Sequence, residues 1–318
     1  MDGRIGIKGM SIKYTRISNG ERYTVLRIPL LILKAFYYRV KASDKLPGRP
    51  FDSYGRRISF SFLLKGKPKI FLHLLCNPVS IVRYFEFAFA LESANWASVR
   101  KCLDVSSPRL FFIYLLKKFP LIHFDIINPD EKDIDETNEY LDVLKLKRRA
   151  SVTPRDALHI PFPDNSYDIV TSISVLEHIP DDEDMLVIRK LWDLLKTGGR
   201  LIITVPCAQS YFEEWKEIDV YAQGNPEKDG DYFFQRFYDL PTLRKRVIEV
   251  LGTEPVLMSV FGEKEKGIYA DYEKKWISLG LRETVKDPFH IVSDYRNFKN
   301  FEDLEGIGVC GLIFEKGA

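Results

Sequence analysis

The sequence has few of the residues that build disulfide frameworks and metal centres. Its 318 residues include only four cysteines, and no two of them form a CxxC pair: Cys76, Cys102, Cys207 and Cys310. The five histidines are equally scattered. This spacing argues against a zinc site and against a disulfide framework. We therefore expect no metal ion and a reducing, cytoplasmic location.

A long uninterrupted apolar run is also missing. Residues 25–41 are apolar, but Arg27, Pro29 and Lys34 interrupt them, so the segment is too short and too charged to cross a membrane. The first residues lack the apolar core and the cleavage site of a secretory signal. Two alternatives remain for residues 25–41: a helix docked on the protein itself, which we prefer, or a basic amphipathic segment at a membrane interface.

Acidic residues are scarce at the start of the chain. Residues 1–100 contain 18 Lys and Arg against 6 Asp and Glu, a net charge of +12, whereas the whole chain carries +2 and the remainder therefore −10. This asymmetry predicts an anionic partner for the basic segment: a lipid surface, a nucleic acid, a phosphorylated substrate or another subunit. We divide the chain into a basic, turn-rich N-terminal extension (1–69) and a main domain (70–318).

The main domain shows short apolar runs that alternate with amphipathic stretches, a pattern typical of a parallel sheet with helices on both faces. An apolar segment at helical spacing, broken at Asn77-Pro78, comes first. Strands are then predicted at 99–105, 122–126, 151–153, 167–174 and 200–205. A helix is predicted between the last two, and Gly198-Gly199 would end it.

Aromatic residues are concentrated after the fifth strand. Residues 207–250 combine many aromatic side chains with a polar, glycine-rich middle, which predicts a lid or cap over a binding site. A helix over 240–252 follows. Two late strands, 255–263 and 306–317, flank a helical segment at 270–281.

Glycine is missing where the first strand turns into a helix, at "CLDVSSPRLF" (Cys102–Phe111). Ser107 is a favoured N-cap and Pro108 suits the first helical position. The turn lacks the positive φ angles and the close ligand approach that glycine permits. The turn alone leaves two alternatives open, a ligand site and a simple helix cap.

Acidic residues end two of the predicted strands. Asp125 lies 21 residues after Asp104, and in nucleotide-binding α/β domains an acid at about this distance binds ribose hydroxyls. The G-x-G-x-x-G motif is absent, which argues against a dinucleotide and less against a ligand without phosphates.

The most informative segment runs from Arg155 to Pro206. It contains Asp156-Ala157, a proline-flanked turn, a strand opened by Asp168, Leu-Glu-His at that strand's exit, an amphipathic helix, Gly-Gly and a final strand. This segment closely resembles the class I S-adenosylmethionine-dependent methyltransferases of the small-molecule type. The resemblance extends from about Val99 to Pro206, and more loosely to the last strand. It implies a doubly wound, mostly parallel, seven-stranded α/β sheet whose last strand is antiparallel, and S-adenosylmethionine as the cofactor.

The resemblance also implies roles for individual residues. Asp104, Val105 and Ser106 would lie near the methionine part of the cofactor, Asp125 would bind its ribose, and Ile126 would lie beside the adenine. Asp156 would contact the adenine amino group, with Ala157 adjacent, and Ser174 and Val175 would lie under the methionine part. The family commonly has glycines where this chain has Ser106 and Pro108.

Substrate-handling residues are predicted from their chemistry and position. His178 follows the fourth strand and is the candidate general base. The alternative is that Glu177 and His178 only hold loop backbone. Arg236 and Tyr238, in the aromatic cap, are candidates for substrate binding, with a packed lid as the alternative.

The predicted function is methyl transfer to an oxygen or nitrogen atom of a small molecule, with a sugar or lipid-linked glycan intermediate as the preferred acceptor. The basic N-terminal segment would contact an anionic membrane peripherally. The alternative is a non-catalytic methyltransferase-like scaffold that needs a partner. A nucleic-acid substrate ranks low because an NPPY-type motif is absent after the fourth strand.

Overall fold

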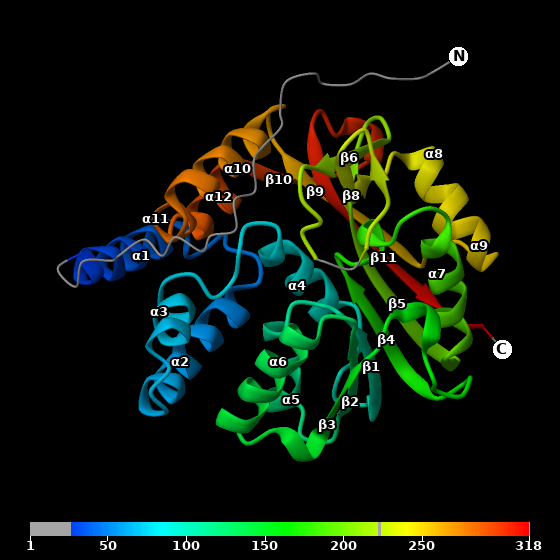
Figure 1. Ribbon diagram of the computed structural model, residues 1–318, viewed down its shortest axis with the longest axis horizontal. Helices are drawn as coiled ribbons and strands as arrows, with labels where there is room; N and C mark the ends of the chain where they lie inside the picture. Colours follow the sequence, from blue (N-terminus) through cyan, green and yellow to red (C-terminus); the bar gives the residue numbers. More distant parts are fainter. Residues whose placement is uncertain (1–26, 222–223, 318) are drawn as a thin grey trace.

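The computed structural model describes residues 27–221 and 224–317, and an eight-stranded sheet lies at its centre (Figure 1). The strand order is β10-β9-β11-β5-β4-β1-β2-β3. The strands are β1 (Lys101–Val105), β2 (His123–Asn128), β3 (Ala150–Pro154), β4 (Tyr167–Ile173), β5 (Leu195–Ala208), β9 (Leu257–Glu263), β10 (Tyr295–Phe298) and β11 (Ile307–Glu315).

The direction of the strands confirms the predicted fold class. Strands β3, β2, β1, β4 and β5 are parallel neighbours, and β11 inserts antiparallel between β5 and β9. The sheet has eight strands instead of the predicted seven. The additional strand, β10, is only four residues long and pairs antiparallel with the edge of β9.

Helices cover both faces of this sheet (Figure 1). One face carries the helices α4 (Arg83–Glu92), α5 (Leu110–Lys118) and α6 (Glu131–Val143). The other carries α7 (Glu183–Asp193), α8 (Leu240–Leu243) and α9 (Glu249–Leu251), the last two joined by a π-helical turn at Arg244–Ile248. α4 lies close to the sheet because Gly311 has no side chain: a Cβ there would be 2.6 Å from the Phe89 ring.

Helix α7 ends differently from the prediction. It stops at Asp193, and Gly198-Gly199 lie inside β5 rather than at the helix end. The ammonium group of Lys316, beyond the end of β11, donates to the carbonyl oxygens of Trp192, Asp193 and Leu195 at 3.1, 3.2 and 2.8 Å. These bonds satisfy carbonyls that the helix end leaves free.

Three helices precede α4: α1 (Ile28–Ala42), α2 (Arg49–Leu64) and α3 (Pro68–Cys76). We expected turns at residues 45–57, whereas α2 begins there. Gly48 precedes α2 with a φ of 63°, Pro50 lies in its first turn, and Gly55 faces Pro78 so closely that a Cβ would be 2.3 Å away. Glycine and proline therefore start and pack a helix here.

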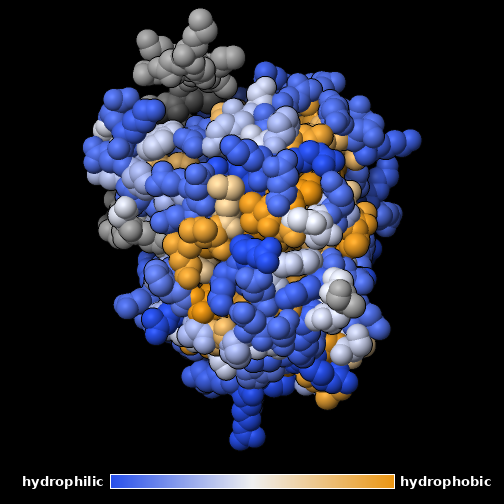
Figure 2. Space-filling model, turned by 90° about the vertical axis from the view of Figure 1, so that its right-hand side faces the viewer, coloured by the Kyte–Doolittle hydropathy of each residue, from blue (hydrophilic) through white to orange (hydrophobic). Residues whose placement is uncertain are grey.

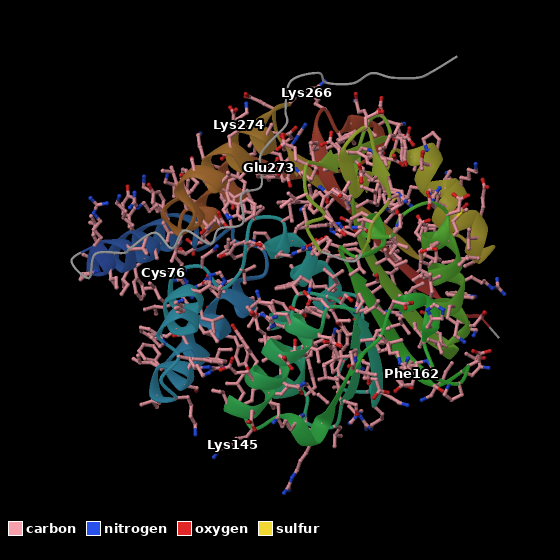
Figure 3. The ribbon with its side chains drawn as sticks, viewed as in Figure 1. Cys76, Lys145, Phe162, Lys266, Glu273 and Lys274 are labelled. Carbon is pink, nitrogen blue, oxygen red and sulfur yellow. The ribbon has the colours of Figure 1, made fainter. Side chains whose placement is uncertain are left out.

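The preferred alternative for residues 25–41, a docked helix, agrees with the position of α1. Leu31 and Ala35 on α1 are buried against Cys76 and Val285. Cys76 is labelled in Figure 3 at the end of α3, beside α1. Among the described residues, no helix has both the length and the apolar character needed to span a membrane.

The segment after β5 forms a cap. Its three-stranded antiparallel sheet consists of β6 (Phe212–Lys216), β7 (Glu227–Lys228) and β8 (Asp231–Phe237). Between β9 and β11 lie the helices α10 (Ile268–Leu279), α11 (Leu281–Thr284) and α12 (Asp287–Ser293). The cap, α10 and α11 contribute residues to the lining of the cavity described below.

Candidate functional site

A cavity of about 1580 Å³ lies at the carboxyl ends of the parallel strands. Segments at the ends of four strands line it: residues 105–110 from the end of β1, 128–130 from the end of β2, 156–159 after β3, and 174–175 with 177–180 after β4. In open α/β sheets, ligands bind at this edge. Residues of α3, α10 and the cap line the remaining walls.

The first turn keeps a tight shape without glycine. Ser106 adopts a φ of 51°, the left-handed conformation that favours glycine. Its backbone N–H and its hydroxyl both donate to the Ile127 carbonyl, at 2.9 and 3.2 Å. The predicted helix cap is wrong: α5 begins at Leu110, and the Ser107 hydroxyl instead accepts from the Ile173 backbone N–H at 3.1 Å. Ser107 therefore ties the first turn to the end of β4.

Asp104 holds this turn from below and does not line the cavity. Its carboxylate accepts from the backbone N–H of Ser107 at 3.1 Å and from the Thr171 hydroxyl at 2.6 Å. Burial raises the pKa of Asp104 to about 6, against the effect of these hydrogen bonds. Of the three residues predicted at this turn, Val105 and Ser106 line the cavity.

The structure places Asp125 away from the cavity. Its carboxylate accepts from the Tyr167 hydroxyl at 2.7 Å and lies 3.4 Å from the Lys101 ammonium. Ile126 is buried in the core that packs against α4, α5 and α6. Asp125 lies away from the cavity because β2 continues to Asn128, two residues beyond the predicted end of the strand.

The last residue of β2 and the two residues after it line the cavity instead. Asn128, Pro129 and Asp130 follow one another there. The Asn128 side-chain amide donates to Asp133 at 2.9 Å, and its oxygen accepts from the Asp130 backbone N–H at 2.9 Å. The Asn-Pro-Asp turn was the sequence signal for this position.

The remaining predicted cofactor residues all border the cavity: Asp156, Ala157, Ser174 and Val175. The Asp156 carboxylate accepts from the backbone N–H groups of Leu158 and His159 at 2.8 and 3.1 Å. Burial raises the pKa of Asp156, but the hydrogen bonds from His159 and Leu158 outweigh it, so the pKa lies below its usual value. Asp156 is therefore an anion at neutral pH.

A buried polar cluster connects α4 with the ends of β4 and β5. The Glu86 carboxylate on α4 is fully buried, and its Oε1 accepts from the hydroxyls of Ser174 and Thr204, the latter at 2.9 Å. Its Oε2 pairs with the Arg83 guanidinium at 2.5 Å. We call Arg83, Glu86, Ser174 and Thr204 the α4 cluster. The sequence indicated a helix here, but gave no sign that its polar residues reach the site.

Glu177 and His178 lie next to the α4 cluster and line the cavity. Glu177 is 2% exposed, and its Oε2 has no hydrogen-bond partner among the described residues. Burial raises the pKa of Glu177 to about 8, against the opposing charge of Arg83. Its Oε1 lies 3.9 Å from the His178 Nε2.

His178 is held in one tautomer. Its Nδ1 lies 2.7 Å from the Phe234 carbonyl oxygen, which only accepts, so Nδ1 carries the proton. Burial lowers the pKa of His178 to about 4. The Nε2 atom is therefore unprotonated at neutral pH, and the Tyr221 hydroxyl lies 3.4 Å from it.

Arg236 and Tyr238 are not among the cavity residues. Both are buried, and both bind the buried carboxylate of Asp184: the Arg236 Nη1 lies 2.7 Å from it and the Tyr238 hydroxyl donates at 3.1 Å. Arg236 also donates to the Ile179 carbonyl at 2.7 Å. The packed-lid alternative describes their position: they attach the cap to the loop that carries His178.

The middle of the chain is similar to known methyltransferases. Residues 118–203 match a family described as a methyltransferase domain. A sterol 24-C-methyltransferase of Aspergillus fumigatus is 30% identical over 101 residues, which cover 32% of this chain and 24% of that protein. A demethylmenaquinone methyltransferase of Listeria welshimeri is 31% identical over 98 residues, 30% of this chain and 40% of that protein. The matches thus span less than half of these curated relatives.

The fold has a counterpart among solved structures. The crystal structure of the [4+2]-cyclase SpnF superposes with a TM-score of 0.50 at 16% identity, covering 86% of this chain and 97% of that one. At this identity the likeness concerns the fold alone. The strand order, the antiparallel β11 and the family match over residues 118–203 agree with the resemblance found in the sequence. Residues 118–203, at the centre of this doubly wound sheet, are therefore similar to a methyltransferase domain.

Proposed function

We propose that the protein transfers a methyl group from S-adenosylmethionine to an oxygen or nitrogen atom of a small molecule bound in this cavity. One observation carries the proposal: an unprotonated His178 Nε2 faces the cavity beside the Glu177 carboxyl, whose Oε2 has no hydrogen-bond partner among the described residues. A methyl acceptor with a hydroxyl or amine group must lose a proton, and this pair can take it.

The residues around the cavity fit the cofactor. The anionic Asp156 suits an exocyclic amine, and the Asn128–Asp130 turn offers acceptors for ribose hydroxyls. Ser106, Ser174 and Val175 border the region expected for the methionine part, and Ser106 already has the backbone conformation that glycine would supply. When bound, the cofactor supplies a methyl group on a positively charged sulfur.

The chain's own residues then position and deprotonate the acceptor. The Phe234 carbonyl keeps the proton on His178 Nδ1, so Nε2 points its lone pair at the acceptor. The proton moves from the acceptor to Nε2. A pKa of about 4 makes His178 a weak base while Glu177 is neutral, whereas ionised Glu177 stabilises the imidazolium across 3.9 Å.

A sugar-containing acceptor, free or lipid-linked, remains the preferred substrate class. Tyr221, Phe234 and Trp276 line the cavity and offer flat faces against which a sugar ring can pack. The exposed apolar and basic residues of α1 support a lipid-linked acceptor, because such an acceptor is held at a membrane surface.

Two measurements test the proposal. Isothermal titration should show binding of S-adenosylhomocysteine, and no binding at millimolar concentration would contradict the proposal and favour the non-catalytic alternative. Labelled S-adenosylmethionine incubated with a panel of glycosides and lipid-linked sugars should label one of them. His178→Gln should abolish this labelling and keep S-adenosylhomocysteine binding, which separates proton removal from cofactor binding.

A further inference from the structure

Helix α1 presents an apolar face to solvent on the side away from the protein core. Leu30, Leu33, Tyr37 and Val40 recur at helical spacing and are between 52% and 72% exposed. We call these four residues the α1 stripe. The opposite side of α1, with Leu31 and Ala35, already provides its contact with the protein. The stripe is thus not needed to dock the helix.

Basic side chains accompany this stripe. Arg27, Lys34 and Lys41 recur every seven residues and lie on the same side of the helix as the stripe, and all three are exposed. Residues 27–43 contain no acidic residue. Over residues 27–69 there are eleven basic residues against two acidic ones, and one of these two, Asp52, is buried and paired with Arg39 and Arg56.

Exposed apolar residues also occur elsewhere on the surface of the protein. The face shown in Figure 2, opposite α1, also has apolar residues among hydrophilic ones. Leu186 on α7 is 64% exposed, much like Leu33 at 66%. The neighbours of Leu186 on α7, however, include Asp182, Glu183 and Asp193.

Helix α2 also has exposed apolar residues near its end, Phe60, Leu63 and Leu64, with the exposed Arg57 and Lys65 close to them in sequence. In α1, by contrast, the apolar stripe and the basic residues run along the whole length of the helix.

We propose that α1 binds the surface of an anionic lipid bilayer, with the stripe in the interface and the three basic residues at the headgroups. This arrangement is typical of interfacial helices, which bury an apolar face to shallow depth and hold anionic lipid with Lys and Arg. Charge also disfavours other occupants. Residues 1–26 carry five basic and two acidic residues, and a second copy would bring a basic helix to a basic helix.

The position of α1 connects this surface with the cavity. Leu72 and Leu281 pack against the cluster formed by Leu31 and Ala35, and both also line the cavity. An acceptor held in the bilayer would enter the cavity next to α1. This part of the inference rests on the proposed methyl transfer, whereas lipid binding itself does not.

Sedimentation with lipid vesicles tests the inference on the full-length protein without cofactor. Vesicles of phosphatidylcholine with about one third phosphatidylserine should bind the protein at least about tenfold more strongly than pure phosphatidylcholine vesicles. Leu33→Glu and the pair Lys34→Glu with Lys41→Glu should each weaken this binding at least about tenfold. Leu186→Glu and Lys245→Glu, on the far side of the molecule, should change it less than about twofold.

Three results would overturn the inference. One is equal binding to both vesicle types that the lysine substitutions leave unchanged. Another is no vesicle binding together with a dimer that Leu33→Glu dissociates in light scattering, which would make the stripe an interface between copies. The third is that the protein is a monomer, does not bind vesicles, and has α1 amides that hydrogen exchange shows to be protected only while residues 1–26 are present. That result would mean that residues 1–26 cover the stripe. Titration of S-adenosylhomocysteine on the same variants shows that they are folded, and it tests the methyltransferase proposal separately.

Discussion

The Oε1 atom of Glu177 lies 3.9 Å from the Nε2 atom of His178 at the cavity wall. The Glu177 side chain is almost fully buried, and that of His178 is largely buried. Burial acts on them in opposite directions, since it raises the pKa of the carboxyl to about 8 and lowers the pKa of the imidazole to about 4. At neutral pH both groups are therefore predominantly uncharged, and the pair can accept a proton without holding a charge beforehand.

The charge state of this pair can be read by nitrogen NMR of the histidine ring. Between pH 5 and 8 the His178 Nδ1 should be protonated and Nε2 unprotonated. As Glu177 ionises near pH 8, the Nε2 resonance should shift, because an anion appears next to it. Glu177→Gln should remove this shift and keep the tautomer. A wild-type shift near pH 8 that survives in Glu177→Gln would contradict the assignment.

Stability should depend on pH through His178. Its folded pKa of about 4 lies below the unfolded value of 6.5, so the unfolded state binds the proton first as the pH falls. Stability from this group is complete above 6.5 and is lost towards pH 4, by roughly 2–4 kcal/mol. His178→Gln should lose less stability than wild type over this window in urea unfolding. Parallel curves for the two proteins would show that His178 is not buried in its neutral form.

The acid and the amide near the end of β2, Asp125 and Asn128, should respond differently to substitution. Asn128→Ala should weaken S-adenosylhomocysteine binding by roughly three- to tenfold, the effect of one lost hydrogen bond. Asp125→Asn should leave that binding within about twofold, but lower stability by about 1–2 kcal/mol because Tyr167 loses a charged acceptor. Calorimetric titration and urea unfolding measure the two effects, and a reversed pattern would restore Asp125 as the ribose ligand.

Breaking the α4 cluster should destabilise the fold. Arg83→Met leaves the fully buried Glu86 carboxylate without its cation, which should cost about 2–4 kcal/mol even though Arg83 is partly exposed. The matched control is Arg189→Met on α7, whose exposed pair with Asp193 should contribute at most about 0.5 kcal/mol. Similar losses in the two variants would mean that the Arg83–Glu86 pair behaves as an ordinary surface pair.

Ser106→Gly tests the cost of the glycine-free turn. A serine with a φ of 51° is strained, so glycine should stabilise the protein by about 0.5–1 kcal/mol despite the loss of the 3.2 Å bond to Ile127. Ser151→Gly in β3 serves as the control, because glycine weakens a strand and should destabilise there. Thermal unfolding distinguishes the two directions. Destabilisation by Ser106→Gly would show that the hydroxyl contributes more than the strain.

Local patterns predicted the elements whose signals are local. The five parallel strands and α7 were found because apolar periodicity marks each of them separately. Strand β10 was missed because four residues at a sheet edge, two of them exposed, have no distinct period. Asp125 was expected at the cavity edge because the predicted strand ended two residues early, whereas Asp125 lies inside β2, which continues to Asn128.

The contribution of α4 could not be predicted for a different reason. Helical periodicity predicted a helix from Pro78 on, which the structure shows as α4, but not that Glu86 would lie under the ends of β4 and β5. This placement depends on the contacts of Glu86 with Ser174 and Thr204, which lie 88 and 118 positions further along the chain. Only the folded arrangement brings these residues together.

The α4 cluster extends the candidate site to residues that precede the region matching the methyltransferase family. The family match begins at residue 118 and the first strand at Lys101, yet Arg83 and Glu86 complete the polar floor of the site. A fragment that begins at residue 99 would contain every strand of the eight-stranded sheet. It would lack Glu86, the residue whose carboxylate accepts hydrogen bonds from the hydroxyls of Ser174 and Thr204. In this chain the residues that build the candidate site therefore begin upstream of the region that matches the family.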